Sequence, residues 1–297
     1  MSKGRVLVTG NKGFIGGHVY EYLRKKGYDV YGCDLQEGYN ITSYSTLETL
    51  PDVDYVCHIG AIGDTYECAK NPALAMYVNA YGTSNMLTWA KQRGVRRFIY
   101  ASTWEVYGKA ALNFEKGQEP LLIEAMPCYP DHPYNISKYS GEMMVRAYKH
   151  LHKMRTLSLR LGTAYGPNMR PNGVIPLFLR KMANDEDITI MGTGNQYRQF
   201  TYVSDIAMAF RAVIEASDGA FDLTDYVNIV GEERTTIRDL VKGYGKVKYA
   251  PARLGDPDPA LVSSGQAKSI FGWEPKVEFR RGMKELAESM GLDLEML

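Results

Sequence analysis

Two side chains that could perform acid–base chemistry, Tyr134 and Lys138, stand four residues apart. In a helix, residues i and i+4 lie on one face, one turn apart. An ammonium group held there favours the phenolate and lowers the pKa of the phenol from its usual value of about 10. The spacing therefore predicts a tyrosine base that can remove the proton of an alcohol.

A glycine-rich run near the start of the chain contains Gly10, Gly13 and Gly16. It follows the apolar segment 5–9 and precedes an amphipathic segment, which predicts a strand, a tight turn and a helix. Such a turn lets the backbone approach a pyrophosphate, and the helix N-terminus supplies N–H donors. The spacing differs from the G-x-G-x-x-G fingerprint. Together with the tyrosine and lysine, the run predicts a nicotinamide-dependent enzyme.

Asp34 ends the second predicted strand and lies 18 residues after Gly16. A carboxylate at this place accepts a hydrogen bond from the ribose 2′-hydroxyl of NAD and repels the 2′-phosphate of NADP. The sequence therefore predicts NAD as the cofactor. The alternative is an ordinary glycine turn beside an aspartate that caps a helix.

The rest of the first half alternates short apolar runs with long amphipathic segments. The expected strands are 53–59, 96–101 and 156–161, and the expected helices between them are 72–93 and 134–152. This alternation predicts an α/β fold with a doubly wound parallel sheet. Ligands bind at the carboxyl ends of such strands, where Asp34, Gly60, Ala61 and Thr103 fall.

The composition changes after about residue 165, where the chain becomes rich in loops. We expect residues 1–165 to form a nucleotide-binding domain and 166–297 to form mainly a smaller α/β lobe. A strand and a helix near 195–216 are expected to return to the first domain.

Charge and composition exclude several classes of function. The 297 residues include 35 basic and 34 acidic side chains, a net charge of +1, and no basic stripe suggests nucleic acid as a partner. No apolar run is long enough to predict a membrane span. The four cysteines have neither metal spacing nor disulfide density, so we expect a cytoplasmic protein without a metal site.

Motifs along nearly the whole chain resemble those of one family, the extended short-chain dehydrogenase/reductases of the NAD-dependent epimerase/dehydratase type, which act on nucleotide sugars. The matching segments are 9–16, 54–61, 79–83, 101–108, 134–138, 165–167, 173–176, 198–205, 253–256 and 271–275. The resemblance implies a Rossmann-type domain at 1–165, a substrate-binding lobe, and NAD as the cofactor.

The resemblance also implies roles for individual residues. Tyr134 would take the proton of the sugar C4 hydroxyl, Lys138 would lower its pKa and hold the nicotinamide ribose, and Thr103 would bind the reacting oxygen. The implied cofactor-binding residues are Gly10, Gly13, Phe14, Ile15, Gly16, Asp34, Gly60, Ala61, Asn79, Tyr134 and Lys138. The implied substrate-binding residues are Thr103, Trp104, Thr163, Val174, Arg198 and Arg253. The two arginines would grip the diphosphate, since guanidinium groups match phosphate oxygens.

A homodimer is a further expectation, because the family pairs its long helices into a four-helix interface. The helices at 72–93 and 134–152 carry apolar residues beyond one core stripe: Met76, Tyr77, Tyr81, Met86, Met143, Met144 and Tyr148.

Two departures from the family pattern affect the expected reaction. Trp104 stands where 4,6-dehydratases carry an aspartic acid that protonates the leaving oxygen, and an indole has no titratable proton to give. Glu105 is retained, so a base for the proton on C5 is present. Gly162 and Thr163 replace an aromatic residue and an amide, which leaves the sugar and the nucleotide undefined.

The leading hypothesis is an NAD-dependent nucleotide-sugar 4-epimerase, which oxidises C4, turns the 4-keto sugar and returns the hydride to its other face. One alternative is a 4,6-dehydratase or decarboxylase that uses Glu105 on the 4-keto intermediate. Another is a 4-dehydrogenase or reductase that exchanges its cofactor. A catalytically silent NAD-binding sensor or scaffold is the alternative outside enzymes.

Overall fold

The computed structural model describes residues 3–110, 121–251 and 260–293. Its larger part is a six-stranded parallel sheet with the order β10-β6-β4-β3-β1-β2. The strands are β1 (Arg5–Thr9), β2 (Asp29–Cys33), β3 (Tyr55–His58), β4 (Arg97–Thr103), β6 (Thr156–Leu161) and β10 (Tyr226–Ile229). The strand order reverses at β1, which has β2 on one side and β3 on the other, and doubly wound sheets bind ligands at this switch point. The predicted α/β fold is confirmed.

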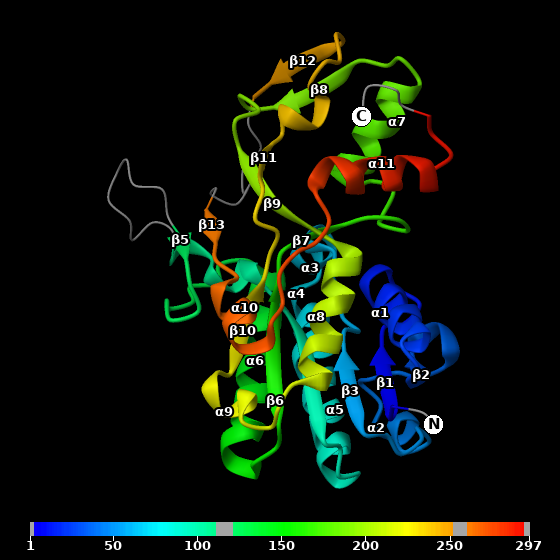
Figure 1. Ribbon diagram of the computed structural model, residues 1–297, viewed down its shortest axis with the longest axis vertical. Helices are drawn as coiled ribbons and strands as arrows, with labels where there is room; N and C mark the ends of the chain where they lie inside the picture. Colours follow the sequence, from blue (N-terminus) through cyan, green and yellow to red (C-terminus); the bar gives the residue numbers. More distant parts are fainter. Residues whose placement is uncertain (1–2, 111–120, 252–259, 294–297) are drawn as a thin grey trace.

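Helices cover both faces of this sheet because its strands are apolar on both sides. Val6 and Val8 of β1 pack with α1 (Phe14–Lys25) and α8 (Val203–Glu215), whereas Leu7 between them faces the other side. That other side is covered by α2 (Tyr44–Leu47), α5 (Gly82–Gln92) and α6 (Pro133–His152). Short helices α9 (Ala220–Leu223) and α10 (Gly265–Phe271) lie at the β10 edge (Figure 1).

The helix predicted at 72–93 is not one regular α-helix. It begins as α4 (Pro72–Ala75), where Asn71 Oδ1 accepts from the backbone N–H of Leu74 at 3.1 Å. A π-helical segment at Met76–Tyr81 follows, and then α5. Such wide turns are common at functional sites. The preceding α3 (Thr65–Lys70) packs near α6.

The helix that carries the predicted base has clear boundary signals. Pro133 occupies its first turn, and His132 Nδ1 accepts the backbone N–H of Tyr134 at 3.2 Å. It ends at Lys153, which has a left-handed φ of 56°. Tyr134 and Lys138 therefore share a helix, as predicted.

The smaller lobe lies above the carboxyl ends of the large sheet (Figure 1). It contains one sheet of β7 (Thr163–Tyr165), β9 (Tyr197–Tyr202) and β11 (Arg234–Thr236), and a second of β8 (Ile188–Met191) and β12 (Val247–Ala250). Helices α7 (Val174–Ala183) and α11 (Phe279–Ser289) pack on them. β5 (Leu121–Leu122) pairs with β13 (Leu261–Val262) beside the large sheet.

The segment expected to return to the first domain divides between the two lobes. β9 belongs to the small sheet, whereas the following α8 packs against α1 of the larger domain. A later segment, β10, forms the edge of the large sheet beside β6. The connection between lobes is therefore made by several crossings of the chain.

The apolar residues expected at a dimer interface have different environments. Met76, Tyr77 and Tyr81 are exposed, and the rings of Tyr77 and Tyr81 stack with centroids 5.2 Å apart. Met86 is fully buried in the core beside the large sheet, so its assignment to the apolar residues beyond the core stripe was wrong. Across the described parts of the chain, no helix combines the length and apolar character needed to cross a membrane.

Candidate active site

The glycine turn brings the backbones of β1 and β3 into direct contact. Gly10 has a φ of 70°, and a Cβ atom at this position would lie 2.8 Å from the Cα of Gly60. A Cβ at Gly16 would lie 2.0 Å from the carbonyl oxygen of Gly10. Glycine is required at both positions because any side chain would separate these segments. The turn therefore presents bare backbone at the carboxyl ends of the two strands.

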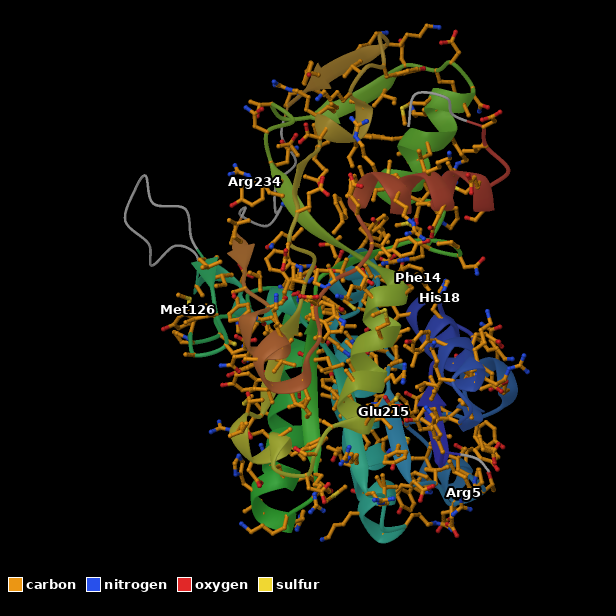
Figure 2. The ribbon with its side chains drawn as sticks, viewed as in Figure 1. Arg5, Phe14, His18, Met126, Glu215 and Arg234 are labelled. Atoms are coloured by element: carbon orange, nitrogen blue, oxygen red, sulfur yellow. The ribbon has the colours of Figure 1, made fainter. Side chains whose placement is uncertain are left out.

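The start of α1 can receive the pyrophosphate of a dinucleotide. Gly13 is its N-cap and offers no side-chain acceptor to the first N–H groups, and the first turn, which begins with Phe14 and Ile15, contains no acid. These donors and the positive end of the helix dipole suit a bound phosphate. Figure 2 shows Phe14 and His18 at the end of α1 nearest the smaller lobe. His18 Nε2 lies 2.8 Å from the carbonyl oxygen of Pro167, which joins α1 to the loop after β7.

Asp34 follows β2 and lies beside the glycine turn. Its Oδ1 accepts from the backbone N–H of Gln36 at 2.9 Å, and its Oδ2 accepts from the backbone N–H of Lys12 at 3.3 Å. Glu37 adds a second carboxylate, which pairs with the Lys12 ammonium at 2.8 Å. This acidic edge fits a ribose hydroxyl and disfavours a phosphate.

A buried hydrogen-bond chain begins at the glycine turn. Thr9 Oγ1 accepts the backbone N–H groups of Ile59 and Gly60 at 2.9 Å each and lies 2.8 Å from His58 Nδ1. Since the oxygen already accepts twice, its proton points to Nδ1, and Nε2 of His58 donates to Thr83 Oγ1 at 3.0 Å. Burial, aided by the charge of Lys138, lowers the pKa of His58 to about 3. His58 is therefore a neutral imidazole of fixed tautomer.

The chain continues through Asn79 to the helix of the predicted base. Thr83 Oγ1 donates to the Asn79 carbonyl at 2.6 Å. The Asn79 side chain accepts from Ile62 N at 2.7 Å and donates to Ile62 O at 3.0 Å and to Ser137 Oγ at 2.9 Å. Ser137 Oγ then donates to the Tyr134 carbonyl at 2.7 Å. Asn79, expected as a cofactor residue, thus ties the loop after β3 to α6, so any contribution to cofactor binding would come through that loop.

Thr103 and Tyr134 meet at the end of β4. Burial and the nearby Glu105 raise the pKa of Tyr134, while a hydrogen bond with Thr103 opposes the rise. Lys138 is buried, and its Nζ lies 4.3 Å from the centroid of the Tyr100 ring. Burial lowers the pKa of Lys138 to about 7, against the raising effect of Glu142. The structure therefore raises the pKa of Tyr134, which is opposite to the lowering by Lys138 that the sequence predicted.

Trp104 and Glu105 lie in a 3-10 turn, Trp104–Tyr107, that follows β4. Thr103 Oγ1 caps this turn by accepting the backbone N–H of Glu105 at 3.2 Å. Burial raises the pKa of Glu105 to about 7, and the guanidinium of Arg198 acts in the opposite direction. Trp104 and Arg198 line one narrow cavity together with Gln199, Val230, Ala260 and Val262. The structure thus brings Glu105 close to both Tyr134 and Arg198, and it places Trp104 and Arg198 in the same cavity.

The remaining predicted substrate residues come from the smaller lobe. Thr163 pairs with Phe200 in the small sheet, and Val174 is the first residue of α7. Both are half-buried. Arg253 lies outside the described residues. A larger cavity of about 290 Å³ between α7, α11 and β11 contains none of the predicted site residues.

Sequence reasoning missed Arg170, which follows β7. Its guanidinium pairs with Asp64 and donates to the Gly63 carbonyl at 3.1 Å, so it clamps the loop after β7 to the loop after β3. Its charge also opposes the rise that burial causes in the pKa of Tyr134. The signal available was weak, because Arg170 stands in a loop without periodicity.

A buried ion pair behind the site was also missed. Arg160 Nη2 lies 2.6 Å from Glu142 Oε1, and both side chains are almost completely inaccessible to solvent. Ser102 Oγ donates to Glu142 Oε2 at 2.6 Å. Glu142 stands four residues after Lys138, so helical spacing would have placed it on the same face.

Comparisons with solved structures, curated proteins and family models show which known proteins this chain resembles. A UDP-glucose 4-epimerase structure from Thermotoga maritima with UDP-glucose superposes with a TM-score of 0.86, 29% identity and coverage of 97% of this chain and 98% of that one. A structure of UDP-glucuronic acid 4-epimerase from Bacillus cereus in complex with UDP-glucuronic acid and NAD superposes with a TM-score of 0.83 and 25% identity. The match covers 97% of this chain and 99% of that one. UDP-glucuronic acid decarboxylase 1 of Danio rerio is 26% identical over 98% of this chain and 73% of its own length.

The family model described as the NAD dependent epimerase/dehydratase family matches residues 6–227. This match spans the large sheet, the glycine turn and both residues of the tyrosine–lysine pair. The chain is therefore an enzyme of the NAD-dependent epimerase/dehydratase family.

Proposed function

We propose that this enzyme is a nucleotide-sugar 4-epimerase. The observation that carries the proposal is the combination of Thr103, Tyr134 and Lys138 with Trp104. The first three suffice for proton transfer at C4, because Thr103 and Tyr134 are in contact and Lys138 lies one helical turn away. Trp104 offers no titratable proton for the leaving oxygen of a dehydration.

Proton transfer is assigned to Tyr134 and orientation to its neighbours. The Tyr134 oxygen takes the proton of the C4 hydroxyl, and Thr103 holds the reacting oxygen by a hydrogen bond. The ammonium of Lys138, one helical turn away, would favour the phenolate and would hold the nicotinamide ribose. NAD, when bound, accepts the hydride from C4 and returns it. Inversion then requires the 4-keto sugar to present its other face to the same groups.

Substrate binding is assigned to the space between β4 and the smaller lobe. Arg198 supplies positive charge for the diphosphate, and Arg253 is proposed as its partner from the sequence. The indole of Trp104 provides an apolar surface for a sugar ring. The names of the T. maritima and B. cereus structures support a nucleoside diphosphate sugar as the substrate class.

A dehydratase or decarboxylase is the second candidate, and Glu105 favours it. Burial raises the pKa of this carboxyl to about 7, which suits a general base or acid at neutral pH. The similarity to a UDP-glucuronic acid decarboxylase supports the same alternative. A 4-dehydrogenase or reductase would use the same Tyr134 and Lys138 but would need to exchange its cofactor during turnover.

Incubation with a panel of UDP- and dTDP-linked hexoses and uronic acids, without added NAD, tests these proposals. Mass spectrometry distinguishes isomerisation from the loss of water or carbon dioxide, and proton NMR identifies the inverted carbon. A product of unchanged mass inverted at C4 supports the epimerase. A product lighter by water or carbon dioxide overturns it in favour of the second candidate. Turnover that occurs only with added NAD or NADH indicates the dehydrogenase or reductase.

A further inference from the structure

Three polar side chains follow one face of α6 at intervals of one helical turn: Tyr134, Lys138 and Glu142. Lys138 and Glu142 are both buried, with Glu142 fully inaccessible. The proposed function uses the first two and leaves Glu142 without a role. A carboxylate removed completely from solvent is costly, so its presence one turn from an essential ammonium calls for an explanation.

Glu142 is fixed in place by residues of the neighbouring strands. Arg160 of β6 approaches it with Nη2 at 2.6 Å from Oε1 and Nε at 3.2 Å from both oxygens. Ser102 of β4 donates to Oε2 at 2.6 Å. The guanidinium itself lies over the rings of Tyr226 and Tyr107, at 3.8 and 4.8 Å from their centroids. The carboxylate therefore has little freedom to turn away from its side of the helix.

Stability alone gives a weak reason for such a pair. Replacing a buried ion pair by apolar residues is often neutral or stabilising, because desolvation offsets the attraction. Arg160 Nη1 is also buried without a hydrogen-bond partner among the described residues, which adds to the cost. A function beyond folding is therefore indicated.

We propose that the buried Glu142–Arg160 pair is a positioning element for catalysis, in which Arg160 holds the Glu142 carboxylate on the Lys138 face of α6 so that its charge keeps Lys138 protonated. This inference rests on the proposed function in one respect, since it takes Lys138 as the partner of Tyr134. Glu142 touches neither substrate nor cofactor and acts only through Lys138.

The other titratable groups around Lys138 do not supply this charge. Cys68 of α3 and Tyr100 of β4 have pKa values raised by burial, so both remain neutral. His58 of β3 is a neutral imidazole because burial lowers its pKa. Burial raises the pKa of Tyr134, so this phenol is also neutral. Glu142, which forms an ion pair with Arg160, is thus the neighbour that opposes the effect of burial on the pKa of Lys138.

The test measures the titration of Lys138 directly by NMR of protein labelled with ¹³Cε-lysine. The Lys138 signal is assigned from its loss in Lys138→Met. The double variant Glu142→Gln/Arg160→Met removes both charges and leaves no unpaired buried ion. We expect the titration midpoint of Lys138 to fall by about one pH unit or more, the usual size of such an effect. Ser102→Ala is the matched control, because it removes a contact of Glu142 but keeps both charges, and it should move the midpoint much less.

An unchanged Lys138 midpoint in the folded double variant overturns the proposal. If that variant fails to fold, Glu142→Asp is measured, in which the shorter carboxylate should lower the midpoint by a smaller amount, and an unchanged value again overturns the idea. The titration needs no substrate, so its outcome is independent of whether the enzyme is an epimerase. In an active variant the alkaline limb of turnover should move by the same number of pH units as Lys138.

Discussion

His58 Nδ1 lies 2.8 Å from Thr9 Oγ1, and this buried contact joins the glycine turn to the helix of the proposed base. Thr9 precedes the turn, and His58 ends the neighbouring strand. Through Thr83, Asn79 and Ser137 the same hydrogen bonds reach the backbone of Tyr134. The glycine turn and the helix of the proposed base are thus joined by a continuous chain of buried side-chain hydrogen bonds.

His58→Phe tests this connection. The ring keeps its place beside Phe98 and Tyr100, but both hydrogen bonds of the imidazole are lost. We expect the free energy of unfolding to fall by about 2–4 kcal/mol, since two buried hydroxyl groups lose a partner. Urea unfolding measures the change, and calorimetric titration should show weaker NAD binding.

Thr88→Val is the control for His58→Phe, because it removes a hydrogen bond to Tyr148 of 2.9 Å at the far end of α5. It should cost about 1 kcal/mol and leave NAD binding unchanged. Equal NAD affinity in His58→Phe and Thr88→Val would show that the connection has no bearing on the cofactor.

Tyr134→Phe should abolish turnover while NAD still binds. The phenol supplies proton transfer, worth about 10²–10⁴-fold in rate, and the remaining ring still packs. Lys138→Ala should lose both turnover and NAD affinity, because the ammonium is proposed to serve the base and the nicotinamide ribose. Steady-state rates and NAD titrations of the two variants provide the comparison. Turnover within tenfold of the parent in Tyr134→Phe would assign the base to another residue.

Local signals in the sequence were sufficient for the fold and for the central pair. Buried apolar runs and amphipathic segments predicted the large sheet, and the helix predicted at 134–152 corresponds to α6 (Pro133–His152). The glycine spacing predicted the turn, because Gly10 and Gly16 allow contacts that a Cβ would block. These features depend on residues close together in the chain.

Features that depend on distant residues could not be predicted in the same way. The pairing of Glu142 with Arg160 requires α6 and β6 to be placed side by side, which the spacing of residues within either element does not report. The raised pKa of Tyr134 follows from burial, which the i, i+4 spacing does not report. The burial of Met86 depends on which side of α5 faces the sheet.

The enzyme should bind NAD more tightly than NADP, and Asp34→Ser should reduce the difference. The carboxylate lies beside the turn at Lys12 and would accept a ribose hydroxyl. Glu21→Gln is the matched control, because it removes an exposed carboxylate of α1 that pairs with Arg24 and is not part of this acidic edge. Fluorescence titration of cofactor-free protein with both nucleotides measures the preference. Tighter NADP binding by the parent enzyme would contradict the assignment of Asp34.

A homodimer is predicted from the exposed apolar surface formed by Met76, Tyr77 and Tyr81. These side chains lie on the helix that packs beside α6, and their exposure suits a contact between copies of the chain. Sedimentation at micromolar concentration should give a dimer, and Tyr77→Glu/Tyr81→Glu should give a folded monomer. Leu223→Glu, at an exposed apolar residue of α9, is the control and should remain a dimer. A monomeric parent protein would remove the prediction.

Glu105→Gln should change the pH dependence of the free energy of unfolding, and its activity should distinguish the candidate reactions. Burial raises the pKa of Glu105 to about 7, so the folded chain binds a proton that the unfolded chain releases between its ordinary value of 4.5 and about 7. Glu105 therefore destabilises the fold increasingly as the pH rises through this range. The glutamine variant should be more stable than the parent by about 1–3 kcal/mol at pH 8, with the difference vanishing near pH 4. Urea unfolding at both pH values measures this.

The same variant, Glu105→Gln, should retain C4 epimerisation, since Tyr134 is the proposed base. A variant that no longer forms product, yet still reduces bound NAD when substrate is added, would make Glu105 an essential base at C5 and favour the dehydratase or decarboxylase.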